Sequence, residues 1–358
     1  MKLAAVIMAG GAGTRFWPVS TSKRPKQFLN LFGKDTLLQQ SYQRIADLVE
    51  PENIFVLTNK DFVELVAEQL PQIPRENIVG EPYRRDTAAA VALSILLAAQ
   101  KVGDCTILTL TADHKIDPKE DFQKTILSAA KRASESKALY TLGITPTYPA
   151  TAYGYLECSQ CLSSSEDTHK HYQLKSFKEK PALELAEKFL AAGNYYWNSG
   201  MFVWHLNSIM DEFKRQQPRH LELLSQAIQD YQTPQWEESL AKAFEPLPKI
   251  SIDYAIMEHA LDVRTVACNF NWLDLGGWLA AAPFLDNHDE NNNSYRGQVY
   301  VYQSENNIIF SDDPQKNIAL VGVQNMAVIY SQGKTLVVPL NRLDEIKKLT
   351  DILPQNLR

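Results

Sequence analysis

A glycine-rich segment near the start of the chain is the first place where the sequence suggests chemistry. Residues 9–18 read Ala-Gly-Gly-Ala-Gly-Thr-Arg-Phe-Trp-Pro and follow an apolar run that is typical of a buried strand. Glycines let backbone N–H groups approach a phosphate chain, and Arg15 adds a planar set of donors for phosphate oxygens. A glycine cluster alone is a weak signal, so a tight turn at a strand end is the alternative.

Two common phosphate-binding loops are excluded by the residues that follow these glycines. A Walker loop requires Gly-Lys-Ser/Thr, whereas Gly13 is followed by Thr14 and Arg15. A dinucleotide-binding loop opens a helix at once, whereas Pro18 and Pro25 interrupt this stretch. The sequence therefore favours neither a kinase of the P-loop type nor a dehydrogenase.

One lysine and two aspartates extend the set of candidate residues. Lys26 stands eleven residues after Arg15 and can reach the same anion, although a solvated basic turn is the alternative. Asp113 follows an apolar run, which places it at the strand ends where open α/β sheets bind ligands, although a single Asp more often caps a helix. Asp274 is the second carboxylate. Mg²⁺ is usually held by one or two carboxylates together with substrate phosphates and water, so this pair is a candidate Mg²⁺ site.

Six further segments, taken with the glycine-rich segment and Pro25-Lys26-Gln27-Phe28, carry a family resemblance along nearly the whole chain. They are residues 81–88 (Glu-Pro-Tyr-Arg-Arg-Asp-Thr-Ala), 111–114 (Thr-Ala-Asp-His), 177–181 (Phe-Lys-Glu-Lys-Pro), 197–202 (Trp-Asn-Ser-Gly-Met-Phe), 251–258 (Ser-Ile-Asp-Tyr-Ala-Ile-Met-Glu) and 272–278 (Trp-Leu-Asp-Leu-Gly-Gly-Trp). In this order the set resembles the nucleotidyltransferases that activate sugar 1-phosphates, and within them the mannose-1-phosphate guanylyltransferases.

The resemblance implies a reaction and a role for each residue. The reaction is the Mg²⁺-dependent transfer of GMP from GTP to mannose 1-phosphate, by in-line attack on the α-phosphorus, giving GDP-mannose and pyrophosphate. The implied catalytic residues are Arg15, Lys26, Asp113, Lys180 and Asp274, of which Asp113 and Asp274 bind the metal. The implied nucleotide-binding residues are Ala9, Gly10, Gly11, Gly13, Thr14, Arg15, Lys26, Glu81, Arg85, Thr87 and Asp113. The implied sugar-phosphate-binding residues are Tyr153, Gly154, Glu179, Lys180, Asn198 and Asp253.

Departures from the family pattern leave the substrates open. Where the family commonly has Pro-Glu-Thr-Gly-Tyr-Gly-Tyr, residues 149–155 read Pro-Ala-Thr-Ala-Tyr-Gly-Tyr, and Leu273 and Gly277 replace residues that are usually Asn and Ser. The alternatives are the same chemistry with another pair, such as dTTP with glucose 1-phosphate, and a catalytically silent regulatory subunit that binds nucleotide sugars. Glu81 can accept two hydrogen bonds from guanine, and a solvent-facing Glu before a proline is the alternative for that residue.

Apolar strand-like runs that alternate with helical periods predict the elements that position these residues. The predicted strands are 3–9, 53–58, 105–111, 138–144, 154–158, 172–177, 200–205, 298–302, 307–310 and 326–330, and the predicted helices are 36–49, 87–101 and 342–353. We expect an α/β nucleotidyltransferase domain of Rossmann-like (GT-A-like) type with a mixed, mostly parallel sheet over residues 1–287. The resemblance adds a small β-rich domain over 288–358, for which a short left-handed β-helix is one form, with a terminal helix. Residues 286–294 are the predicted linker.

The composition of the chain limits the classes of molecule that it is expected to bind. The chain has 358 residues and a formal net charge of −6, which predicts no general attraction to nucleic acid. The first apolar run is too short for a membrane span, and four scattered cysteines favour a reducing compartment, so we expect a cytoplasmic protein that does not bind membranes. Cys158 and Cys161 with His169 and His171 leave a zinc site as a minor alternative. The resemblance also implies a homodimer.

Overall fold

The structure is a computed structural model that describes residues 1–11, 13–165 and 167–358, so Ala12 of the glycine-rich segment and Glu166 lie outside the described residues. The chain forms two compact units that are interleaved in sequence. Unit 1 consists of Met1–Gly10, Ser41–Thr111 and Ile116–Trp272, and unit 2 consists of Gly11–Gln40, Ala112–Lys115 and Leu273–Arg358.

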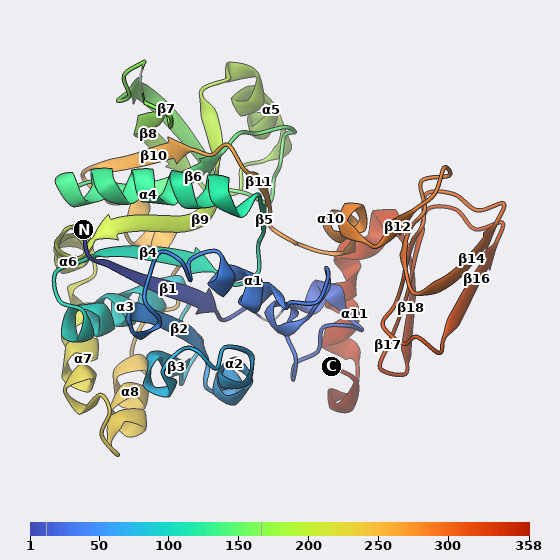
Figure 1. Cartoon of the computed structure of the whole chain (residues 1–358), viewed down its shortest axis with the longest axis horizontal. Helices are drawn as coiled ribbons and strands as arrows, with labels where there is room; N and C mark the ends of the chain where they lie inside the picture. Colours follow the sequence, from blue (N-terminus) through green and yellow to red (C-terminus); the bar gives the residue numbers. More distant parts are fainter. Residues whose placement is uncertain (12, 166) are drawn as a thin grey trace. The chain divides into compact units, whose positions relative to one another are not determined.

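Unit 1 is built on a nine-stranded sheet with the order β3-β2-β1-β4-β9-β6-β10-β8-β7. Its strands are β1 (Leu3–Ala9), β2 (Ile54–Asn59), β3 (Ile78–Glu81), β4 (Thr106–Thr111), β6 (Leu139–Ile144), β7 (Tyr155–Cys161), β8 (His171–Lys178), β9 (Tyr195–His205) and β10 (Val263–Ala267). The pairs within β3-β2-β1-β4 are parallel, and β9 lies antiparallel between β4 and β6 (Figure 1). The predicted mixed α/β sheet is confirmed, with its continuous parallel part confined to the first four strands in this order.

Helices cover both faces of this sheet. One face carries α3 (Thr87–Lys101), whose small alanines let it pack closely on β1 and β2, and outside it lie α6 (Leu206–Gln216), α7 (Pro218–Ala227), α8 (Trp236–Phe244) and α9 (Ile252–Ala255). The opposite face carries α4 (Lys119–Glu135), which packs on β4, β6, β9 and β10 (Figure 1). Alternate residues of β1 therefore face two different helical layers, which explains why both sets are apolar.

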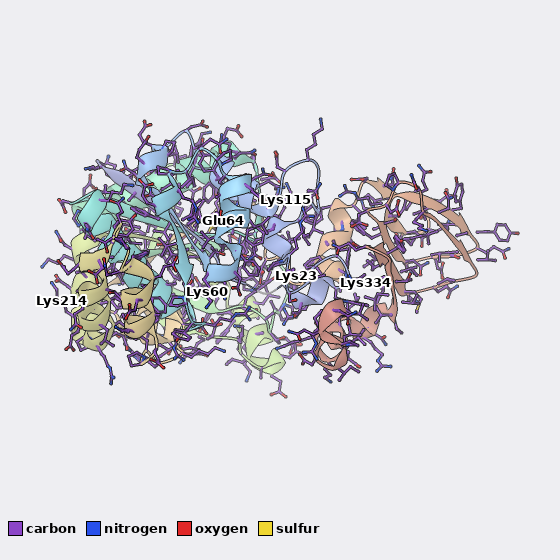
Figure 2. The ribbon with its side chains drawn as sticks, turned by 90° about the horizontal axis from the view of Figure 1, so that it is seen from below. Lys23, Lys60, Glu64, Lys115, Lys214 and Lys334 are labelled. Carbon is purple, nitrogen blue, oxygen red and sulfur yellow. The ribbon has the colours of Figure 1, made fainter. Side chains whose placement is uncertain are left out.

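The remaining elements of unit 1 lie at its periphery. α2 (Val63–Gln69) and the short helix η4 (Lys60–Phe62) follow β2, and α5 (Leu183–Ala192) follows β8. β5 (Lys115–Asp117) and β11 (Asn271–Leu273) pair in a separate two-stranded sheet. Charged side chains such as Lys60, Glu64 and Lys214 point away from the core into solvent (Figure 2).

Most predicted elements are present, with shifted ends. The strand over 3–9 and the helix over 87–101 have the predicted bounds. The helix predicted over 36–49 is shorter, because α1 (Leu37–Gln43) is followed by turns in which Ile45 and Leu48 donate backbone hydrogen bonds to the residues three positions before them. None of the helices in the described ranges is long and apolar enough to span a membrane.

Unit 2 stacks short parallel strands, and the last residues of the glycine-rich segment join its core. Its strands are β12 (Asn287–His288), β13 (Ser294–Arg296), β14 (Gln298–Tyr302), β15 (Ile308–Ser311), β16 (Asn317–Val321), β17 (Met326–Ser331) and β18 (Lys334–Pro339), followed by η9 (Leu340–Glu345) and α11 (Ile346–Ile352). β13, β15 and β17 pair in parallel, and so do β14 and β16, so successive turns of the chain lie on one another. Phe16 and Trp17 join Trp278 and Phe310 in the core of this unit.

The predicted linker over 286–294 is an ordered part of unit 2. Asn293 is fully buried, and its side chain donates hydrogen bonds to Asp289 and to the carbonyl of Ser304. Its Oδ1 accepts from the backbone and the side chain of Asn307 at 3.0 and 2.9 Å. Asn307 in turn donates to the carbonyl of Val323 and accepts from the backbone N–H of Met326. Composition predicts a loop for these polar residues. In the structure, the side-chain amides of Asn293 and Asn307 instead form a buried amide ladder, in which each side chain bonds to neighbouring stacked turns of the chain.

The predicted domain boundary between residues 287 and 288 stays a prediction.

We expect Asn307→Ala to lower the free energy of unfolding by about 2–4 kcal/mol, because buried partners on three turns lose their hydrogen bonds at once. Chemical denaturation of the full chain measures this loss. Asn317→Ala, at an exposed position of β16, is the matched control and should change stability by less than about 0.5 kcal/mol. Equal stabilities of the two variants would contradict a structural role for the ladder.

Candidate functional site

The ammonium group of Lys26 is the centre of the charged cluster in unit 2. Its Nζ lies 2.9 Å from Asp113 Oδ2 and 3.6 Å from Asp274 Oδ1, and it donates to the carbonyl of Leu275 at 3.0 Å. His114 Nε2 lies 3.8 Å from Oδ1 of each aspartate. Three segments that are far apart in the sequence thus bring together Lys26, Asp113 and Asp274, which the sequence had singled out. His114, missed as a site residue, could have been found only by its position next to Asp113.

Burial and opposite charge set the protonation of this cluster. Burial acts to lower the pKa of Lys26, but the adjacent Asp113 and Asp274 outweigh it and raise the pKa above its usual value. Burial acts to raise the pKa of Asp113, but Lys26 and His114 hold it below its usual value. The lysine is therefore charged and Asp113 is ionised at neutral pH.

The glycine-rich segment is held against the same cluster. A Cβ atom at Gly13, where φ is +61°, would lie 2.8 Å from both Cβ and the backbone N of Lys26, so only glycine allows this approach. The side chain of Gln27 donates to the carbonyl of Gly11 at 3.0 Å and fixes the loop. Arg15 is exposed, and its guanidinium lies 3.5 Å from the carbonyl of Gly276. Thr14 opens the short helix η1 (Thr14–Phe16).

The donors of this cluster fit a Mg²⁺ ion. Asp113 and Asp274 both lie within ion-pair distance of the Lys26 ammonium, so their carboxyl groups face the same point. Carboxylate oxygens are the ligands that Mg²⁺ prefers. Within the described residues no group of three or more His, Cys, Asp and Glu side chains could hold a metal ion. Mg²⁺ usually keeps waters and substrate phosphates as its remaining ligands, so two carboxylates are a sufficient protein contribution.

In unit 1, Glu81 ends β3 and lies beside the residue that follows β1. A Cβ atom at Gly10 would be 3.9 Å from Glu81 Oε1, so the glycine leaves space in front of this carboxyl group. Burial, followed by the charge of Asp86, raises the pKa of Glu81 to about 8. Ala9, the last residue of β1, accepts a hydrogen bond from Thr58 through its carbonyl. A carboxyl group with so high a pKa at a strand end is characteristic of functional sites.

Arg85 and Thr87, the other nucleotide-binding candidates of this region, are engaged in the scaffold. The guanidinium of Arg85 donates to the carbonyls of Phe244 and Glu245 at the end of α8. Thr87 Oγ1 accepts from the backbone N–H of Ile252 at 2.8 Å. Arg85 thus ties the segment before α3 to the end of α8, and Thr87 ties the start of α3 to Ile252, next to Asp253.

A second cluster in unit 1 contains most of the sugar-phosphate-binding candidates. Asn198 donates to Asp253 Oδ1 at 3.0 Å and accepts from Thr141 Oγ1 at 2.8 Å, and its backbone N–H donates to the carbonyl of Gly154. Lys180 Nζ lies 2.7 Å from Glu179 Oε1. Burial, followed by the charge of Glu179, raises the pKa of Asp253 to about 6.

The neighbours of this cluster explain its shape. A Cβ atom at Gly154 would lie 2.5 Å from Glu179 Oε2, so this position requires glycine. Tyr153 makes edge-on contacts with Trp197 and Trp272, with ring centroids 5.1 Å apart in each pair. Thr141, which fixes Asn198, was missed, because a threonine inside an apolar strand gives no sequence signal of its role.

Strand pairing places these unit 1 residues along one edge of the sheet. β1, β3 and β4 are linked by parallel pairings, so Gly10 and Glu81 lie at their shared carboxyl edge. β9 is antiparallel to both β4 and β6, so the end of β6 points to the same edge, and there Gly143 pairs with Asn198. This is the edge at which open α/β sheets bind ligands.

The zinc alternative has no support in the geometry. Cys158 is buried and Cys161 is exposed, at ladder positions opposite Leu174 and Tyr172. His171 is bonded through Nε2 to Ser128 Oγ at 2.9 Å, and burial, followed by the charge of Arg132, lowers its pKa to about 4. The two cysteines are residues of β7, and His171 is a neutral core residue.

The chain is similar to known proteins along nearly its whole length. The mannose-1-phosphate guanylyltransferase of Klebsiella pneumoniae is 38% identical over 359 residues, covering 99% of this chain and 75% of that protein. The protein of the same name from Escherichia coli is 37% identical over 99% of this chain and 75% of its own length. A crystal structure described as mannose-1-phosphate geranyltransferase from Thermus thermophilus matches with a TM-score of 0.86 and 32% identity, covering 98% of this chain and 99% of that chain.

The family model described as nucleotidyl transferase matches residues 4–288, a range that contains the glycine-rich segment, Glu81 and both clusters. Relatives at this level of identity confirm the resemblance drawn from the motifs. The chain therefore belongs to the nucleotidyl transferase family and is a nucleotidyltransferase.

Proposed function

We propose that the chain transfers GMP from GTP to mannose 1-phosphate, giving GDP-mannose and pyrophosphate. The observation that carries the proposal is the ammonium of Lys26 shared by Asp113 and Asp274 beside the glycine-rich segment. Relatives that carry the name mannose-1-phosphate guanylyltransferase support the choice of substrates.

The reaction makes one bond and breaks one. A phosphate oxygen of mannose 1-phosphate attacks the α-phosphorus of GTP, and the bond from that phosphorus to the oxygen bridging to the β-phosphate breaks, so that pyrophosphate leaves with the electron pair. The attacking phosphate is already ionised near neutral pH, and no general base is needed. Orientation and charge neutralisation then provide most of the catalysis.

The side chains have distinct tasks in this scheme. Arg15 and Lys26 donate to the triphosphate, and Lys180, which is mostly exposed, exchanges Glu179 for the phosphate of the sugar. Asn198 and Glu179 bind sugar hydroxyls. Asp113 and Asp274 would hold Mg²⁺, which supplies positive charge for the phosphates when bound.

The retained charges distinguish the proposal from a silent binding subunit. A module that only binds nucleotide sugars has no need for a buried lysine between two aspartates, since assembling such a group is energetically costly. The same chemistry with another nucleotide and sugar phosphate is the nearest alternative, because Ala150 and Ala152 depart from the family pattern described in the sequence analysis.

A substrate grid tests the pairing. Pyrophosphate release is measured in Mg²⁺ with GTP, ATP, dTTP, UTP and CTP, each against mannose and glucose 1-phosphates. We expect release with GTP and mannose 1-phosphate to exceed every other pair. A larger rate with dTTP and glucose 1-phosphate would reassign the substrates, and silence throughout would favour the regulatory subunit.

Removal of either shared carboxylate tests the charged cluster. We expect Asp113→Asn and Asp274→Asn to lower turnover by about 10²–10³-fold, since each change removes a carboxyl group from a pre-organised site. Asp344→Asn, at an exposed position of η9, is the control and should retain full turnover. Circular dichroism and thermal melting confirm folding of each variant, and near-normal turnover in both site variants would refute the role of the pair.

The raised pKa of Glu81 predicts how GTP affinity depends on pH. Guanine offers two N–H donors, so binding requires the ionised carboxylate, whose fraction grows until the pH exceeds about 8. We therefore expect GTP to bind roughly tenfold more tightly at pH 8 than at pH 6.5, with little change above pH 8.5. Calorimetric titration of the full chain measures this.

The matched variants separate Glu81 from other titrating groups, including those of GTP. Glu81→Gln should bind GTP weakly and lose the rise between pH 6.5 and 8, whereas Glu187→Gln, at an exposed position of α5, should keep it. An unchanged pH profile in Glu81→Gln would exclude Glu81 from base recognition.

A further inference from the structure

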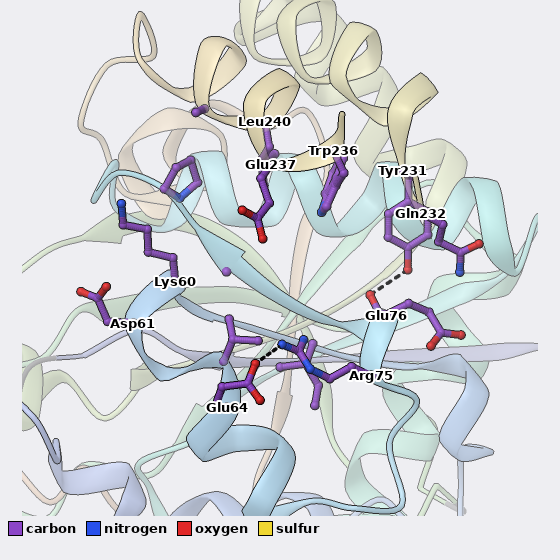
Figure 3. Close-up of a pocket in the computed structure, with 15 residues that line it drawn as sticks. Lys60, Asp61, Glu64, Arg75, Glu76, Tyr231, Gln232, Trp236, Glu237 and Leu240 are labelled. Atoms are coloured by element: carbon purple, nitrogen blue, oxygen red, sulfur yellow. Dashed lines mark hydrogen bonds and ion pairs between the residues drawn. The ribbon is translucent and has the colours of Figure 1, made fainter. Parts of the chain in front are cut away.

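The outer edge of β3 borders a groove that the proposed reaction does not use. β3 is the last strand on its side of the nine-stranded sheet, and in the described part of the chain no strand pairs with its outer edge. The groove has a volume of about 700 Å³ and is lined by residues of β3, of η4 and α2, and of α8 with the turn before it. Figure 3 shows β3 running between the side chains of α8 on one side and those of α2 on the other.

Of the strand and the residue after it, Ile78, Gly80 and Pro82 line the groove between its two walls. At Gly80 the wall of η4 and α2 packs directly on the strand, because a Cβ atom there would lie 2.7 Å from Lys60 Cα and 2.8 Å from Val63 Cγ2. On the other side, the hydroxyl of Tyr231 donates to the carbonyl of Glu76 at 3.0 Å, just before β3 (Figure 3). Open strand edges of this kind accept an extended peptide as a further strand.

The charges in the groove select the kind of peptide. Six charged residues line it, two of them cationic and four acidic, namely Lys60, Arg75, Asp61, Glu64, Glu76 and Glu237. Arg75 pairs with Glu64 at one wall, and Glu76 pairs with Lys101 outside the groove. The formal charge of the lining is therefore −2, which disfavours phosphates and favours a basic partner.

The first turn of α8 supplies a specific contact for a cationic side chain. The carboxylate of Glu237 and the indole of Trp236 both point from α8 into the groove (Figure 3). Trp236 is held edge-on by Tyr231, with ring centroids 5.3 Å apart. An aromatic face next to a carboxylate is the combination that binds a guanidinium or ammonium group.

We propose that the groove beside β3 binds an extended, basic segment of another protein, which pairs with the open edge of β3 and places a Lys or Arg side chain between Glu237 and Trp236. Gly80 and Pro82 line the groove and flank Glu81, so the occupant would lie against the strand end that carries this carboxyl group. The proposal does not depend on the identity of the nucleotide or the sugar.

The test uses a fluorescent eight-residue peptide of alternating Arg and Val, titrated into the full chain and followed by anisotropy. We expect saturable binding that Glu237→Lys weakens at least tenfold and Trp236→Ala weakens as well. Glu238→Lys is the matched control, because Glu238 lies on the same helix but outside the groove and pairs with Lys242. Thermal melting and pyrophosphate release verify that each variant is folded, since none of these residues belongs to the proposed machinery.

Two further peptides separate strand pairing from charge attraction. A peptide with alternate N-methylated residues keeps the charges but loses backbone donors, and it should bind at least tenfold more weakly. A peptide of alternating Glu and Val should not bind. The proposal is overturned by absence of saturable binding of the Arg-Val peptide, by equal binding of its N-methylated form, or by equal weakening in Glu237→Lys and Glu238→Lys.

Discussion

The ammonium of Lys26 between two carboxylates is the interaction on which the charged cluster of unit 2 depends. An unpaired charge in a buried position would cost several kcal/mol, so the lysine and Asp113 require one another. Their partners come from segments separated by most of the chain, and each segment is fixed by its own device. Gly13 gives room for Lys26, and Gln27 fixes the carbonyl of Gly11. The carbonyl of Leu275, next to Asp274, completes the set of acceptors.

The clusters of unit 1 follow a different electrostatic design. Burial raises the pKa values of Glu81 and Asp253 without a cation in contact to offset it fully. The ionised form of such a carboxyl group is stabilised most when a ligand donates hydrogen bonds to it, because these bonds replace the hydration that burial removed. In unit 2 the Lys26 ammonium already balances the charge of the carboxyl groups. The carboxyl groups of unit 1 are instead arranged to accept hydrogen bonds from a ligand.

The sequence indicated the charged residues that lie together better than it indicated the residues that support them. Asp113 follows an apolar run, and β4 ends at Thr111, two residues before it, so its location just after a strand followed from pattern alone. Arg85 and Thr87 belong to a matching motif, yet their side chains hold α8 and the start of α9. A motif records which residues occur together, and only packing shows which of them are already bonded within the scaffold.

Long-range pairing also explains what the fold prediction missed. The strands at 3–9 and 105–111 were predicted, but no local pattern indicates that β9 enters antiparallel between β4 and β6. Asn293 lies in a run of polar residues that favours a loop, and its burial depends on Asn307 and Ser304, fourteen and eleven positions away. Hydrogen bonds between stacked turns outweigh local composition at this point.

The interleaving of the two units has a consequence for biosynthesis. Residues 11–40 leave the ribosome early, but the core that Phe16 and Trp17 enter includes Trp278 and Phe310. During translation these apolar residues must wait for more than two hundred residues before Trp278 and Phe310 exist, and Lys26 gains Asp113 first and Asp274 only much later. The nascent chain therefore carries an N-terminal segment with exposed apolar side chains through most of its synthesis. Chaperones that shield hydrophobic surface are expected to bind such a segment.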